Sequence, residues 1–171
     1  GMEDLPLIGG KNASLGELHR GLIPLGIRVP PGFAITAEAY RSFLGASDLG
    51  ARLRALLADL NTSDLHGLAE HGRQARELIL AAPFPEDVRQ QISAAYQELC
   101  QRHGREVDVA VRSSATSEDL PEASFAGQQE SFLNIRGERA LIDACRQCLA
   151  SLFTDRALSY RVDKGFDHFS V

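Results

Sequence analysis

Residues 48–103 carry apolar side chains at helical spacing almost throughout, and this pattern restricts the fold more than any other feature of the chain. Apolar positions that recur every three or four residues predict helices that bury one face. The pattern is interrupted at Pro83 and Pro85, because proline cannot continue a helix. Three apolar stripes result, at residues 49–60, 65–79 and 88–99. They predict packing faces and indicate no function.

Two shorter segments have the pattern of β-strands. In residues 107–112, three valines alternate with small or polar residues, which predicts a half-buried strand with Arg112 on the face opposite the valines. A polar loop follows at 113–124, and residues 130–135 form a second β-like run. Because helices dominate elsewhere, we expect an α+β fold that is rich in helix and has a small, mostly antiparallel sheet.

Signals at the N-terminal end predict a helix, a short strand and another helix. Leucines 15, 18 and 22 predict a helix that begins near residues 11–12 and ends before Gly26. Residues 29–35 suggest a turn that leads into a short strand. Thr36 then suits the N-cap of the next helix.

Signals at the C-terminal end predict two more helices and the start of a strand. An apolar face from residue 141 to residue 152 predicts a long helix, and Thr154 is expected to cap a final helix through Tyr160. Phe169 is expected to begin another strand. A chain that ends while entering a strand is expected to be part of a longer protein.

Composition argues against several classes of protein. The formal net charge is −5 and no basic run stands out, so we do not expect sequence-independent binding to nucleic acid. No apolar stretch approaches about 18 residues, so no membrane span is expected, and the N-terminus lacks the features of a signal peptide. Three cysteines, an odd number, do not suggest a disulfide framework. A reducing compartment is therefore expected, and we predict the cytoplasm.

Cys145 and Cys148 have the spacing of a redox or zinc motif. Both fall on the apolar stripe of a predicted helix, however, and no second pair of ligands completes a tetrahedral site. Buried free cysteines are common as small hydrophobic residues. We therefore predict that these two belong to the core, and we predict no metal site in this chain.

The segment Gly9-Gly10-Lys11-Asn12 lies where the first helix is expected to begin. Glycines allow a tight turn, a helix N-terminus carries partial positive charge, and a lysine there can reach a phosphate. The spacing is not that of a P-loop. Lys11 shares a stripe with the leucines of this helix, where it needs an anionic partner. The alternative is an ordinary glycine turn with a solvated lysine.

Arg112 and Gly127 are the other candidates from local pattern. Arg112 ends a strand before a loop rich in hydroxyl groups, and a guanidinium can bond two phosphate oxygens at once. Its alternative is a structural ion pair with Glu118 or Asp119. Gly127 precedes a strand, where the backbone can approach a ligand closely. It is equally consistent with an ordinary turn.

Several segments together resemble one family, the phosphoenolpyruvate synthases and pyruvate phosphate dikinases, in the N-terminal part of their ATP-grasp domain. The resemblance covers nearly the whole chain in order, and the helical middle is the least distinctive part. Residues 11–17 and 165–168 are similar to the synthase branch. The segments that carry the family resemblance are Gly9–Glu17, Val29–Tyr40, Ala110–Glu130, Ala150–Ala157, Tyr160–Arg161 and Gly165–His168.

The resemblance implies a role in ATP binding. Residues that match Lys11 and Arg112 hold the ATP phosphates in this family, and those that match Gly127 and Ser131 line the same phosphates. Threonine is commoner than serine at the last position, and Ser131 keeps the hydroxyl. The family's enzymes phosphorylate a histidine on a swivelling domain with ATP, release AMP and phosphate, and pass the phosphoryl group to pyruvate with Mg²⁺. Charge neutralisation and positioning are what this chemistry needs.

The resemblance also implies that residues 1–171 are the first part of the ATP-grasp domain. The second half, with the Mg²⁺ ligands and the adenine pocket, the phosphohistidine domain and the pyruvate barrel are expected elsewhere in the same polypeptide. This chain is expected to be inactive alone, and a homodimer stays open for the full-length enzyme. A rifampin phosphotransferase is a second reading within the family. A stand-alone nucleotide-binding regulatory module is a third.

Overall fold

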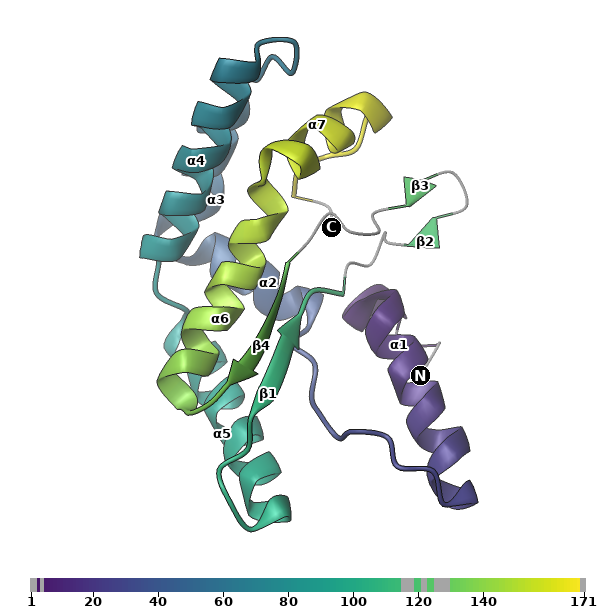
Figure 1. Ribbon diagram of the computed structural model, residues 1–171. Helices are drawn as coiled ribbons and strands as arrows, with labels where there is room; N and C mark the ends of the chain where they lie inside the picture. The colour runs from purple at the N-terminus through teal and green to yellow at the C-terminus, as the bar shows by residue number, and fades with distance from the viewer. Residues whose placement is uncertain (1–2, 4, 115–118, 121–122, 125–129, 170–171) are drawn as a thin grey trace.

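A computed structural model describes residues 3, 5–114, 119–120, 123–124 and 130–169. Figure 1 shows a body of helices with a short β-ribbon along one side and the first helix set apart from it. The α-helices and strands, in chain order, are α1 Leu5–Leu22, α2 Ala37–Gly45, α3 Leu49–Leu57, α4 Leu65–Ala81, α5 Glu86–His103, β1 Val109–Arg112, β2 Asp119–Leu120, β3 Ala123–Ser124, β4 Ser131–Ile135, α6 Glu138–Ala150 and α7 Asp155–Lys164. Three 3₁₀ turns join them, η2 Ile23–Leu25, η3 Ala46–Asp48 and η4 Ser151–Phe153. The helix-rich α+β prediction is confirmed.

Side-chain caps begin three of the helices. Thr36 Oγ1 accepts a hydrogen bond from the Ala39 amide at 3.3 Å, and Thr154 Oγ1 accepts one from the Ala157 amide at 3.3 Å. Asp64 Oδ1 accepts bonds from two amides at the start of α4. Such a cap satisfies backbone donors that have no partner within the helix. The two threonine caps expected from the sequence are confirmed.

The β-ribbon consists of β1 and β4, which pair antiparallel. Arg112 is paired with Ser131, and Val111 with Phe132. Val111 and Phe132 are partly buried, whereas Arg112 and Ser131 are exposed, as the alternation of a strand requires. Helix α6 packs against both strands, and α4 packs against α6 (Figure 1). A second antiparallel pair joins β2 and β3.

The core lies among α2 to α7 and is filled by their apolar stripes. Phe43 and Phe84 pack with ring centroids 4.8 Å apart, and the fully buried Phe153 belongs to the same cluster. Cys145 and Cys148 are both buried and have free thiols, which confirms them as core residues. Arg161 is also buried, with 1% of its surface exposed. No sequence pattern had indicated a buried arginine.

One predicted strand does not form, and the residue expected to begin another lies in a turn. Residues 29–35 have no regular secondary structure, and the two prolines within them lack the amide protons that a sheet ladder needs. Phe169 lies in a turn, and its ring packs 6.0 Å from the ring of Phe153 and 4.7 Å from the guanidinium carbon of Arg54. This aromatic side chain therefore packs against the core although it lies in a turn. Its apolar character alone suggested a strand.

Helix α1 is kinked at Gly9, whose φ is 74° and ψ is 167°. The part after the kink begins within two residues of the predicted start, and Gly26 caps the 3₁₀ turn that follows α1. The short turn before the kink was not predicted. Leu15 and Leu18 are 42% and 49% exposed, so the leucine stripe is not a packing face among the described residues.

Among the residues that the structure describes, no helix has both the length and the apolar character that crossing a bilayer requires.

Candidate phosphate-binding site

The start of α1 meets the end of β1 through three contacts, although these segments lie 102 residues apart in the sequence. The Asn12 amide donates a hydrogen bond to Ser114 Oγ at 3.1 Å. Lys11 Nζ lies 3.5 Å from the carbonyl oxygen of Ser113, at the outer limit of a hydrogen bond. Gly9 touches Ser114, because a Cβ added to this glycine would lie 2.1 Å from the Ser114 carbonyl oxygen. In Figure 1 this end of α1 approaches the end of β1.

Arg112 and Ser131 lie directly opposite each other across β1 and β4. Residues paired in this way point to the same face of a sheet, with Cβ atoms about 5 Å apart. Both are exposed, and both face away from the partly buried Val111 and Phe132. Within the described part of the chain, no ion pair involves Arg112. The expected alternative is an ion pair of Arg112 with Glu118 or Asp119. The structure does not describe the side chains of these two residues.

Three of the four predicted phosphate ligands lie on segments that contact one another, α1 with the residue after β1, and β1 with β4. Lys11 contacts the residue that follows Arg112, and Arg112 is paired with Ser131. A phosphate at this place would meet two cations and a hydroxyl, the groups that suit its charge and its acceptor oxygens. The fourth predicted ligand, Gly127, lies outside the described residues.

The positive charge of Lys11 also acts on the end of α6. Burial raises the pKa of the Cys148 thiol to about 11, while Lys11 opposes this rise and Glu130 adds to it. Cys148 Sγ lies 3.9 Å from the Glu130 carbonyl oxygen, and the Glu130 amide donates to Ser151 Oγ at 3.3 Å. The charge of Lys11 therefore acts on a thiol that also contacts the residue before Ser131.

The helix N-terminus is partly occupied by the protein's own groups. Ser114 Oγ accepts a hydrogen bond from the Asn12 amide, and Asn12 Nδ2 donates to the Ile8 carbonyl oxygen at 3.0 Å across the kink. The amide of Asn12 is therefore not available to a phosphate in this arrangement. The predicted anion cradle depends on the Lys11 and Arg112 cations more than on this amide.

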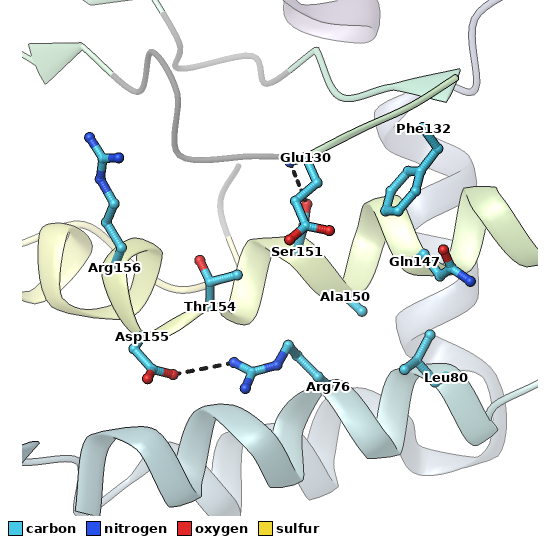
Figure 2. Close-up of a pocket in the computed structure, with 10 residues that line it drawn as sticks. All are labelled: Arg76, Leu80, Glu130, Phe132, Gln147, Ala150, Ser151, Thr154, Asp155 and Arg156. Carbon is cyan, nitrogen blue, oxygen red and sulfur yellow. Dashed lines mark hydrogen bonds and ion pairs between the residues drawn. The ribbon is translucent and has the colours of Figure 1, made fainter. Parts of the chain in front are cut away.

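A separate pocket of about 580 Å³ lies between α4, α6 and the start of β4. Figure 2 shows that its walls carry charges of both signs, with Arg76 turned toward Asp155. Arg76 Nη1 lies 3.3 Å from Asp155 Oδ1 and donates to the Phe153 carbonyl oxygen at 2.7 Å. Glu130 contributes another carboxylate to the lining. Two arginines, Arg76 and Arg156, and two carboxylates, Glu130 and Asp155, line this pocket, and Arg76 is paired with Asp155. The pocket therefore offers an anion less net positive charge than its two arginines alone would suggest.

Metal-binding groups are not assembled in the described part of the chain. It contains no group of three or more His, Cys, Asp or Glu side chains that could hold an ion. Cys145 and Cys148 also have pKa values raised to about 12 and about 11, mainly by burial, so they are poor sources of the thiolate that zinc requires.

Sequence reasoning missed the part played by Ser114. The run of hydroxyl residues after Arg112 was noted, but no local pattern says which hydroxyl bonds to a segment 102 residues away. The glycine pair was the available signal, since Gly9 marks a close approach of two backbones. It did not identify the partner.

Comparison with known proteins identifies the family of the chain. Residues 5–171 match the family model described as pyruvate phosphate dikinase, AMP/ATP-binding domain. The chain is 52% identical over 176 residues to a phosphoenolpyruvate synthase of Synechocystis, with 100% of the chain and 22% of the relative covered. It is 52% identical over 170 residues to that of Helicobacter pylori, with 99% and 21% covered.

A third relative shows the same partial coverage. The phosphoenolpyruvate synthase of Escherichia coli is 47% identical over 171 residues, with 100% of the chain and 22% of the relative covered. The chain thus spans about a fifth of the length of the curated relatives it matches.

Proposed function

Because the chain belongs to the pyruvate phosphate dikinase AMP/ATP-binding domain family, we propose that it binds the phosphates of ATP through Lys11, Arg112 and Ser131. The observation that carries the proposal is the contact of Lys11 Nζ with Ser113, next to the paired Arg112 and Ser131. Gly127 is the fourth proposed ligand. The family description supports a nucleotide as the ligand, and the two cations support its phosphates as the part that these residues hold.

The proposed chemistry assigns positioning and charge neutralisation to these side chains. Arg112 has a planar fork that can bond two phosphate oxygens, and Lys11 supplies a compact charge from the helix start. Ser131 can donate a hydroxyl proton to an oxygen on the same face as Arg112. Mg²⁺, if bound, would neutralise phosphate charge further, and we propose its ligands outside the described residues.

We further propose that the chain is the first part of the ATP-grasp domain of a phosphoenolpyruvate synthase. Such an enzyme converts pyruvate, ATP and water to phosphoenolpyruvate, AMP and phosphate through a phosphohistidine. The names of the relatives and their 47–52% identity support this assignment. The second ATP-grasp half, the phosphohistidine domain and the pyruvate barrel are proposed for the rest of the polypeptide, and the cytoplasm as its compartment.

Titration of Mg-ATP into the 171-residue chain, followed by two-dimensional NMR, tests the phosphate site. Two cations at an exposed site support a dissociation constant near 1 mM, about −4 kcal/mol. We expect Lys11→Ala and Arg112→Ala each to weaken binding about tenfold, because each removes a charge-assisted hydrogen bond.

The chain offers matched controls for both substitutions. Lys164 is its only other lysine, and Arg139 is an exposed arginine at the start of α6. Lys164→Ala and Arg139→Ala should leave the dissociation constant within about twofold. Equal loss in the controls and in the site variants would reduce the interaction to general charge attraction and overturn the proposal.

A further inference from the structure

The contact between Gly9 and Ser114 fixes how close α1 can come to β1. With φ of 74° and ψ of 167°, Gly9 occupies a backbone region that is almost restricted to glycine. A Cβ at this residue would lie 2.1 Å from the Ser114 carbonyl oxygen and 2.6 Å from Ser114 Oγ. Because Gly9 has no side chain, its backbone can contact the backbone of Ser114 at the kink.

Ser114 also bonds to the first turn after the kink. Its hydroxyl accepts from the Asn12 amide at 3.1 Å, and Asn12 Nδ2 closes the kink by donating to the Ile8 carbonyl oxygen at 3.0 Å. Helix N-termini have amides without partners inside the helix, and a side chain from elsewhere in the chain satisfies one of them here. The bond therefore ties the backbone next to Lys11 to the backbone that follows Arg112.

Helix α1 packs against α2 as well as contacting Ser114. Among the described residues of α1, those that are buried are Gly9, Gly10 and Ala13, which lie at or next to the kink. Leu15 and Leu18, further along the helix, are exposed. The far end of the helix continues into η2 and points away from the helical body (Figure 1). The Ser114 hydrogen bond is made by the residue directly after Lys11, so it acts on the backbone that carries this lysine.

We propose that Ser114 is a positioning residue of the phosphate site: its hydroxyl holds the first turn of α1 so that Lys11 stands beside Arg112. The inference rests on the proposed function, because it explains how Ser114 positions the two cations that are proposed to bind phosphate. Ser114 touches no phosphate in this proposal. It acts through the Asn12 amide, and its loss separates the cations without removing either charge.

The test is an NMR titration of the 171-residue chain with inorganic pyrophosphate, combined with hydrogen exchange at the Asn12 amide. Ser114→Ala should speed exchange at Asn12 and weaken pyrophosphate binding about fivefold, the equivalent of about 1 kcal/mol. Ser114→Thr keeps the hydroxyl and should restore both values to within about twofold. Ser14, an exposed serine on the same helix, supplies the matched control, and Ser14→Ala should change neither.

The outcomes separate this inference from the function on which it rests. If Ser114→Ala binds like the wild type while Lys11→Ala and Arg112→Ala bind more weakly, the inference fails and the phosphate site stands. If neither cation variant changes binding, or the wild type shows no shifts, the phosphate site fails and the inference with it. If Ser114→Thr is as weak as Ser114→Ala, a role for the hydroxyl is overturned. Should Ser114→Ala not fold, Ser114→Cys fills the same space with a weak acceptor and should show the same loss.

Discussion

The buried Arg161 donates a hydrogen bond from Nε to Nδ1 of the partly buried His168 over 3.1 Å. The same guanidinium donates to the Leu152 carbonyl oxygen and lies 5.7 Å from the ring centroid of Phe153. Burial, the largest cause, lowers the pKa of Arg161 to about 10, and Tyr40 and Asp167 partly oppose this. Because Nδ1 of His168 accepts this bond, the imidazole must be neutral while the bond exists.

This arrangement predicts that stability falls when the solution is acidified. Burial and, next, the Arg161 charge lower the pKa of His168, although Asp167 acts in the opposite direction. The unfolded chain, with an ordinary histidine near pKa 6.5, then binds more protons than the folded chain. The free energy of unfolding should therefore decrease as the pH falls through about 6.5 toward the lowered pKa. Urea unfolding at about pH 7.5 and pH 5.5 measures this change.

His168→Gln is the control for the pH effect. Glutamine offers Arg161 an acceptor oxygen and does not titrate in this range. The variant should be close to the wild type at the higher pH and lose less stability at the lower pH. The same acid loss in both proteins would assign the effect to groups other than His168.

The helices and their caps were predictable because their signals are local. The apolar stripes of α3 to α6 and the caps at Thr36 and Thr154 each depend on residues within a few positions of one another. The strand prediction that failed has the opposite cause. Residues 29–35 have suitable side chains for a strand, but a strand also needs a partner, and no local pattern supplies one.

The candidate site was predictable residue by residue but not as an arrangement. Lys11 and Arg112 were identified from charge, glycine spacing and the family resemblance. Their approach depends on the Ser114 contact with Asn12, which joins segments 102 residues apart and leaves no periodic signal. The buried Arg161 escaped prediction for a similar reason, because its partner His168 and the Leu152 carbonyl are assembled only by the packing of α7.

Gly9→Ala should destabilise the chain by about 2–3 kcal/mol or more. An alanine there must adopt a backbone region that costs about 1–3 kcal/mol, and its Cβ would overlap the Ser114 carbonyl. Gly21→Ala is the matched control, because Gly21 lies in the same helix and a Cβ there meets nothing within 4 Å. That change should be neutral or stabilising by up to about 1 kcal/mol. Urea unfolding of the three proteins distinguishes local strain from a general effect of alanine in α1.

Arg112→Lys should weaken pyrophosphate binding less than Arg112→Ala but should not restore it. The lysine keeps the positive charge opposite Ser131, yet it loses the planar fork that bonds two oxygens. We expect about a threefold loss for Arg112→Lys and about a tenfold loss for Arg112→Ala. NMR titration measures all three dissociation constants. A lysine variant that equals the wild type would show that charge alone acts at residue 112.

The three cysteines should differ in reactivity toward a thiol reagent such as a disulfide dye. Burial raises the pKa of Cys145 to about 12 and that of Cys148 to about 11, so near pH 8 both are almost fully protonated as well as enclosed. Cys100 is only partly buried. One thiol should therefore react in the native protein and three in urea, and Cys100→Ser should remove the native reaction. Rapid labelling of Cys145 or Cys148 in the folded Cys100→Ser protein would contradict their place in the core and reopen a redox role for this pair.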